Sequence, residues 1–137
     1  MSEELSQRTE EIHAALDAFS AALTPAAPAD HLAFSRLRVR LAAAIKNYIF
    51  VESDEVLGPL RARQDEALKP MLDAVQAETT ILRLAYSEHI QKWPNQALMA
   101  SWPIYRKESA VLVERLLVFT RLRASIEYRT AKQLVTE

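Results

Sequence analysis

The feature that most constrains this chain is its shortage of glycine, since Gly58 is the single glycine among 137 residues. Hairpins and bulges use glycine where the backbone turns tightly or adopts a positive φ. Much of the sequence consists instead of Ala, Leu, Glu, Arg and Gln, which are strong helix formers. The sequence therefore predicts an all-α protein, and its length is that of one domain covering residues 1–137.

Apolar side chains recur at helical spacing in four segments, at about 2–23, 30–57, 60–93 and 103–135. Ser2 and Asp30 are candidate N-caps of the first two segments. Prolines and the Gly58-Pro59 pair separate the segments, because proline lacks the amide hydrogen that a helix interior needs. Four amphipathic helices joined by short connections predict an up-and-down four-helix bundle.

The core of this bundle is predicted from one stripe of residues on each helix. These positions are Leu5, Thr9, Ile12, Leu16, Phe19, Leu23, Phe34, Leu37, Leu41, Ile45, Tyr48, Val51, Leu68, Leu72, Val75, Thr79, Leu82, Tyr86, His89, Trp93, Leu112, Leu116, Phe119, Leu122 and Ile126. Pro70 lies inside the third segment, where it either begins a new helix or kinks a continuous one. Residues 97–101 are expected to form a short turn.

The net charge of −1 and the absence of cysteine narrow the classes of function. A nearly neutral chain offers no general attraction to nucleic acid or to a membrane surface, so neither is expected as a partner. No apolar run approaches the roughly 20 residues that cross a bilayer. Without cysteine there are no disulfides and no thiolate metal sites, which agrees with a cytoplasmic location.

The charges are unevenly distributed between the ends of the chain. Acidic residues dominate the first helical segment and basic residues the last. Because the first and last helices of a bundle are neighbours, we expect surface ion pairs between them, each contributing about 0–1 kcal/mol. A weak surface for an anionic ligand on the last helix is the alternative.

Tyr48 and Glu52 form the most informative pair of polar residues. They lie four residues apart on one helical face, close to the predicted core. A glutamate that faces a core is costly unless it is paired, hydrogen-bonded or bound to a metal. Metal sites in bundles use such inward carboxylates and histidines. An ion pair with an arginine such as Arg129 is the favoured interpretation, and a metal site is the alternative.

The three histidines do not form a metal-binding pattern, because His13, His31 and His89 include no HxxxH or HExxH pair. His13 lies at the edge of the first apolar stripe, where it could turn inward, but a partly buried or surface position is the favoured interpretation. His31 is expected to be exposed, and His89 to bond carbonyls near a helix end. No nucleophile elbow, phosphate-binding loop or Ser/His/Asp set is present, so no catalytic function is predicted.

Four stretches together resemble the hemerythrin-like (HHE cation-binding) domain family. Residues 41–60, LAAAIKNYIFVESDEVLGPL, are similar to its second helix, with Tyr48 at a histidine position and Glu52 at a glutamate position. EEIHAALDAF resembles the first helix, with its histidine at His13. AETTILRLAY (77–86) and RLRASIEYRT (121–130) resemble the last two helices. The resemblance covers nearly the whole chain in helix order.

The resemblance implies a hemerythrin-like bundle whose ligand set is largely replaced. Only His13 and Glu52 remain as metal ligands. The other ligand positions hold Tyr48, Thr79, Ser125 and Arg129. It therefore implies a member that has lost its di-iron site, with no metal or cofactor, which binds a protein partner or a small ligand and is not an enzyme.

Two alternatives to this function stay open. The first is a mononuclear iron site for sensing or storage, formed by His13 and Glu52 with Tyr48 as a third candidate. The second is a helical interaction module, for example a homodimer through the apolar region 93–105. That region is rich in aromatic residues, which are enriched at interfaces, but the same residues would suit a cap over the end of the bundle.

Overall fold

The computed structural model describes residues 3–28 and 30–136, and all regular structure in these ranges is helical. This confirms the prediction of an all-α protein, whereas the N-cap predicted at Ser2 lies outside the described residues. The long helices are α1 (Glu3–Ala22), α2 (His31–Glu52), α4 (Lys69–Lys92) and α6 (Trp102–Arg123). The shorter elements are the π-helix η1 (Ser53–Leu57), α3 (Gly58–Ala62), the 3-10 helix η2 (Glu66–Leu68), α5 (Asn95–Ala100) and α7 (Ile126–Thr136).

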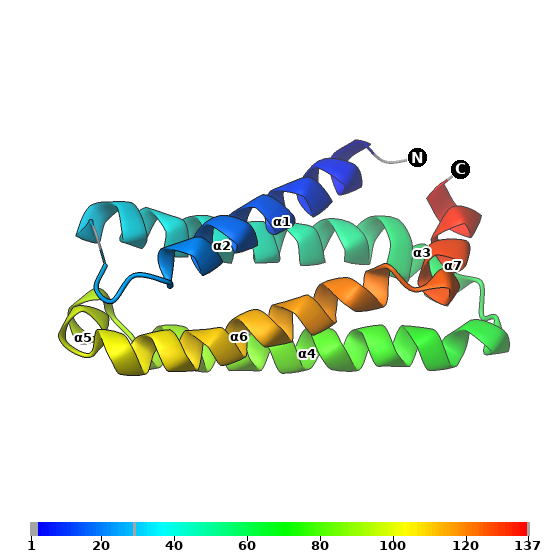
Figure 1. Cartoon of the computed structure of the whole chain (residues 1–137). Helices are drawn as coiled ribbons and strands as arrows, with labels where there is room; N and C mark the ends of the chain where they lie inside the picture. The colour runs from blue at the N-terminus through cyan, green and yellow to red at the C-terminus, as the bar shows by residue number, and fades with distance from the viewer. Residues whose placement is uncertain (1–2, 29, 137) are drawn as a thin grey trace.

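The long helices form two layers (Figure 1). In one layer α1 crosses α2 obliquely, and in the other α4 and α6 lie side by side. Successive long helices run in opposite directions, α5 turns the chain at one end, and α3 and α7 lie together at the other end. No helix among the described residues is long and apolar enough to cross a membrane.

The predicted core stripes are largely confirmed by burial. The buried members are Leu5, Ile12, Leu16, Phe19, Leu23, Phe34, Leu41, Ile45, Tyr48, Val51, Leu72, Val75, Thr79, Leu82, Trp93, Leu112, Leu116 and Phe119. The half-buried members are Thr9, Leu37, Leu68, Tyr86, His89 and Leu122. Asp30 caps α2 as predicted, because its carboxylate accepts from the amides of Leu32 and Ala33 at 2.9 and 3.2 Å.

Gly58-Pro59 does not interrupt the second helical segment, so that prediction is wrong. The chain passes from α2 through η1 into α3, and Pro59 is accommodated in the first turn of α3, where its missing amide hydrogen is not needed. The amide of Gly58 bonds to the carbonyl of Ser53 across the wide π turn. A Cβ at Gly58 would lie 3.1 Å from that oxygen. The chain turns only after Ala62, where Gln64 has a φ of 53°.

Pro70 lies in the first turn of α4, so it begins a new helix and does not kink a continuous one. Residues 97–101 are not merely a turn, because most of them belong to α5.

The fourth helical segment is broken at residues 124–125, which the apolar spacing did not predict. The Ser125 hydroxyl donates to the Leu122 carbonyl at 2.8 Å and accepts from the Tyr128 amide at 3.2 Å. Ser125 thus satisfies backbone groups at the end of α6 and the start of α7. The break changes which face of the chain points inward, so Ile126 is 79% exposed and Tyr128 is 2% exposed.

Aromatic rings fill the end of the molecule near α5. This aromatic cluster consists of Phe19, Phe34, Trp93, Trp102 and Tyr105, with ring centroids 5.1–5.8 Å apart between contacting pairs. The Trp102 indole also donates to the Pro25 carbonyl at 2.9 Å, which fastens the connection between α1 and α2. These rings are buried inside one chain, which favours the interpretation of region 93–105 as an end cap.

The expected ion pairs between the first and last helices do not occur among the described residues. The described ion pairs join Arg40 to Glu11, Lys92 to Glu108, and Arg123 to Glu52. Arg106 on α6 instead donates to the carbonyls of Leu23 and Thr24 just after α1. A cation at the C-terminal end of a helix is favoured by the helix dipole.

Candidate functional site

A buried ion pair lies where the ends of α2 and α6 meet. Glu52 is the last residue of α2 and Arg123 the last residue of α6. The Arg123 Nη2 donates to Glu52 Oε1 at 2.7 Å, and its Nε donates to Oε2 at 2.8 Å. The Glu52 side chain is 1% exposed and the Arg123 side chain is 8% exposed. The pairing is therefore bidentate and almost completely removed from water.

Two tyrosine hydroxyls complete the hydrogen bonding of the carboxylate. Tyr128 on α7 donates to Glu52 Oε2 at 2.6 Å, and Tyr48, one turn earlier on α2, donates to the same oxygen at 3.1 Å. The carboxylate thus accepts four hydrogen bonds from the guanidinium and the two phenols. Such bonding offsets the cost of burying a charge.

The guanidinium of Arg123 has further partners on two helices. Its Nη1 donates to the Phe119 carbonyl at 2.9 Å, and its Nη2 donates to Thr79 Oγ1 at 3.2 Å. The Thr79 hydroxyl in turn donates to the Val75 carbonyl at 2.8 Å. The guanidinium carbon also lies 3.8 Å from the centre of the Phe119 ring.

Residues from α2, α4, α6 and α7 thus meet in one group, which we call the Glu52 network. Its members are Glu52, Arg123, Tyr48, Tyr128 and Thr79. Its position follows from local structure, because η1 begins directly after Glu52, and η1 and α3 pack against α7, which carries Tyr128. Single π turns inside helices often occur at functional sites.

Burial and charge keep the two tyrosines and the arginine of the network in one protonation state near neutral pH. Burial raises the pKa of the Tyr48 and Tyr128 hydroxyls, and the negative charge of Glu52 raises both further. Burial alone would lower the pKa of Arg123, but its hydrogen bonds to Glu52 and the carboxylate charge outweigh this and raise it. The tyrosines therefore remain donors and the arginine remains a cation.

The structure brings together only part of the set of candidate residues expected from the sequence. Tyr48, Glu52 and Thr79 lie in the network. The other three lie apart from it: His13 is exposed on α1, Arg129 is exposed on α7, and Ser125 bonds to backbone groups at the helix break. The ion pair expected for Glu52 is present, but its partner is Arg123 and not Arg129.

Arg123 and Tyr128 are the two network residues that the candidate set omitted. Arg123 continues the apolar stripe of the last segment, since it lies four residues after Phe119 and seven after Leu116. A charged residue on a core stripe is a signal that could have identified it. Tyr128 reaches the network only because the helix breaks at Ser125, and the apolar spacing gives no sign of that break.

The residues of the network do not fit a di-iron site of the kind found in the family that the sequence resembles. Within the described part of the chain, no three His, Cys, Asp or Glu side chains lie close enough to hold a metal ion together. Glu52 already accepts four hydrogen bonds, and a permanent cation occupies the space beside it. His13 is the other metal ligand that the resemblance retains, but it is exposed on α1 and so does not join Glu52 in a metal site.

A second polar contact involves His89 on α4 and Ser109 on α6. The Ser109 Oγ and the His89 Nε2 lie 3.0 Å apart, and the imidazole stacks on Tyr105 at 5.3 Å. The ring of His89 therefore pairs with a serine and not with the helix-end carbonyls that were expected. Ser109 is 0% exposed, so its hydroxyl is not accessible to a substrate as a nucleophile. The pair serves packing between α4 and α6.

No protein-family model, curated protein sequence or solved structure matches this chain. Evidence for its function comes from its own side chains.

Proposed function

We propose that this chain is a non-enzymatic four-helix bundle of hemerythrin-like type that holds an ion pair in place of a di-iron site and acts by binding a partner or a small ligand. The observation that carries the proposal is the buried bidentate pair between Glu52 and Arg123. It supplies, from the chain alone, the positive charge that a metal would supply to an inward carboxylate.

The positive charge of Arg123 disfavours the binding of a metal ion beside Glu52. Two unit charges about 4 Å apart interact by about 4 kcal/mol at an effective dielectric constant of 20. A divalent cation beside Arg123 would be repelled by about twice that amount. It would also have to displace hydrogen bonds of 2.6–2.8 Å from the only carboxylate of the network. The ion pair and a metal ion therefore cannot be present beside Glu52 at the same time.

The helix order supports the bundle and its relation to the hemerythrin-like family. The long helices α1, α2, α4 and α6 alternate in direction, and Tyr48, Glu52 and Thr79 lie inside at the positions that the resemblance assigns to ligands. A binding function fits a molecule with its polar network enclosed and with apolar grooves left open on its surface. We also propose a cytoplasmic protein, since the sequence has no cysteine to oxidise.

Elemental analysis and thermal unfolding test this proposal. The purified chain is expected to contain far less than one transition metal ion per chain, and its melting temperature is expected to stay the same with a chelator or with added Fe²⁺. Ligands that bind only the folded state raise the melting temperature. Iron near one or two ions per chain, or a melting temperature raised by Fe²⁺, would overturn the proposal and restore the iron-site alternative.

A further inference from the structure

An apolar groove lies on the surface between α2 and α4, with a volume of about 490 Å³. Ile45, Ile49 and Tyr86 contribute its inner apolar surface, and Lys46, Phe50 and Arg83 are also among its lining residues. The size and the mostly apolar lining are typical of a binding site.

Contacts at both ends hold the groove open. Near α5, the Arg38 guanidinium on α2 donates to the Trp93 carbonyl and to Asn95 Oδ1. Near α3, Arg61 donates to the Leu72 carbonyl of α4 at 3.4 Å. The groove lies between these two bridges, so it is present before any partner binds.

The apolar surface of this face extends beyond the groove itself. Phe50 is 71% exposed, and Val39, eleven residues earlier on the same side of α2, is 68% exposed. Ile90 is 39% exposed and lies seven residues after Arg83, on the same side of α4. Exposed apolar residues scattered singly need no explanation, but their continuity with a groove marks an interaction site.

The charged residues that line the groove have one sign. Lys46 on α2 and Arg83 on α4 both line the groove, and the residues lining it include no carboxylate. Neither cation has an ion-pair or hydrogen-bond partner among the residues that the structure describes. Two unpaired cations on an apolar groove favour a partner that brings carboxylates.

The groove between α4 and α6 provides a contrast. It is lined by Glu88, Lys92, Glu108 and Arg115, and the Lys92 ammonium already pairs with the Glu108 carboxylate at 2.8 Å. Its charges are mixed and partly neutralised within the chain. The groove between α2 and α4 is therefore the one of the two that selects a partner by charge.

We infer that the groove between α2 and α4 binds an amphipathic helix of a partner protein, with apolar residues along one face and carboxylates beside them. The inference rests on the proposed function as a binding module and names its partner. Helices bind such grooves through apolar residues at positions i, i+3 or i+4, and i+7. Residues 39–52 of α2 span about 20 Å at about 1.5 Å per residue, which matches a partner helix of about 14 residues. A small amphiphile would fill the groove but leave Val39 uncovered.

Peptide selection on the intact chain tests this inference. A display library of 16-residue helical peptides is selected on the immobilised protein, and the enriched peptides are measured by fluorescence anisotropy. We expect an apolar stripe flanked by Asp or Glu. The double variant Lys46→Glu/Arg83→Glu should weaken binding at least tenfold, and Phe50→Ala should weaken it about fivefold.

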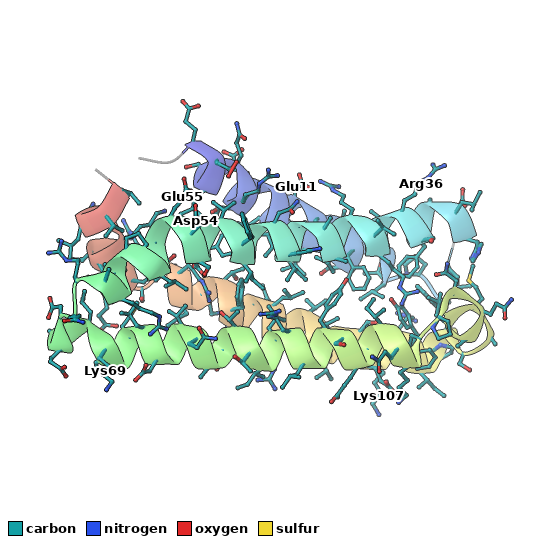
Figure 2. All side chains as sticks on the ribbon, turned by 180° about the vertical axis from the view of Figure 1, so that it is seen from behind. Glu11, Arg36, Asp54, Glu55, Lys69 and Lys107 are labelled. Carbon is teal, nitrogen blue, oxygen red and sulfur yellow. The ribbon has the colours of Figure 1, made fainter. Side chains whose placement is uncertain are left out.

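Matched variants elsewhere on the surface control for general effects of charge and burial. Lys69→Glu/Lys107→Glu reverses two cations that do not line this groove, and Figure 2 shows both side chains on the outside of the molecule. Leu84→Ala removes a side chain that is 61% exposed and does not line the groove. Both variants should leave peptide binding within twofold. Circular dichroism confirms that every variant is folded.

Four results would overturn the inference. A selection that enriches no peptide, or peptides whose binding ignores the groove variants, would reject the site. Peptides without acidic residues would reject the stated partner. Dodecanoate binding that depends on Lys46 and Arg83, with no peptide binding, would assign the groove to a small amphiphile. In each case the elemental analysis and the melting experiments with Fe²⁺ still test, independently of the groove, whether the chain lacks a metal site.

Discussion

The two ends of this molecule are stabilised in opposite ways. At the end near α5, Phe34 packs against Phe19, Trp102 and Tyr105, and the contacts are between rings. At the end near α7, the ion pair between Glu52 and Arg123 is satisfied by directed hydrogen bonds. Apolar burial is non-directional, so a core of this kind tolerates apolar substitutions of similar volume. A buried charge tolerates the loss of its partner poorly.

The largest expected effect is that of Arg123→Met, which leaves the Glu52 carboxylate buried without a counter-charge. The free energy of unfolding should fall by about 3–5 kcal/mol. Urea denaturation followed by circular dichroism measures the change. Arg121→Met, which removes an exposed arginine from the same helix, should change stability by less than about 0.5 kcal/mol.

A double variant separates the charge from the packing in this experiment. Glu52→Leu/Arg123→Met should lose much less stability than the sum of the two single variants, because no unpaired charge remains. Additive losses, or a loss below about 1 kcal/mol for Arg123→Met alone, would show that the two ends do not differ in the way described.

Raising the pH should destabilise the fold through all four tyrosines. Burial raises the pKa of each, to about 12 for Tyr86, and the charge of Glu52 also raises those of Tyr48 and Tyr128. Because these folded-state pKa values exceed the unfolded value of about 10, the stabilisation is complete below pH 10 and is lost above it. Each tyrosine contributes a slope of up to about 1.4 kcal/mol per pH unit.

Denaturation curves between pH 9 and 11.5 measure this loss. Tyr48→Phe/Tyr128→Phe should be less stable at neutral pH, because it removes two hydrogen bonds to a charged group. It should also show about half of the wild-type slope at high pH. A slope that the double variant leaves unchanged would place the alkaline sensitivity at Tyr86 and Tyr105 alone.

Phe34→Leu should cost about 1.5–3 kcal/mol, because leucine keeps most of the apolar burial but loses three ring contacts, each worth at least about 0.5 kcal/mol. Phe34 is 4% exposed, and thermal unfolding measures the change. A cost as large as that of Arg123→Met would mean that the aromatic cluster is as intolerant as the ion pair.

The smallest effect is expected on mild acidification. Burial lowers the pKa of His89, and the positive charge of Arg38 adds to this. The folded state therefore favours the neutral imidazole, so the contribution is present above pH 6.5 and is lost as the pH falls towards the lower folded value. His89→Gln should reduce the difference in unfolding free energy between pH 7.5 and pH 5. If His89→Gln leaves the difference in unfolding free energy between the two pH values unchanged, other groups cause the acid sensitivity.

The sequence was sufficient for the helical class and for most of the core, because apolar spacing directly reports which face of a helix is buried. It also identified Tyr48 and Glu52 as an inward polar pair, and the structure places an arginine against Glu52. The same spacing rule could have found Arg123, since that residue lies on the core stripe of α6.

Breaks in the helices were harder to predict, because they depend on backbone bonds that composition does not report. Gly58-Pro59 has the composition of a helix end, yet a π turn carries the chain through it. Ser125 resembles any polar surface residue, yet its hydroxyl ends α6 and caps α7. Tyr128 was missed because the break at Ser125 decides that its side chain faces inward.

The ion pair also has a consequence for how the chain folds. Glu52 and Arg123 are 71 residues apart in the sequence, so they meet only after both helical layers have assembled. Before that point each charge remains hydrated, and the pair contributes nothing to partly folded states. Its stabilisation should therefore slow unfolding and leave the folding rate nearly unchanged. The Glu52 network would then determine how long the folded molecule lasts and have little influence on how fast it forms.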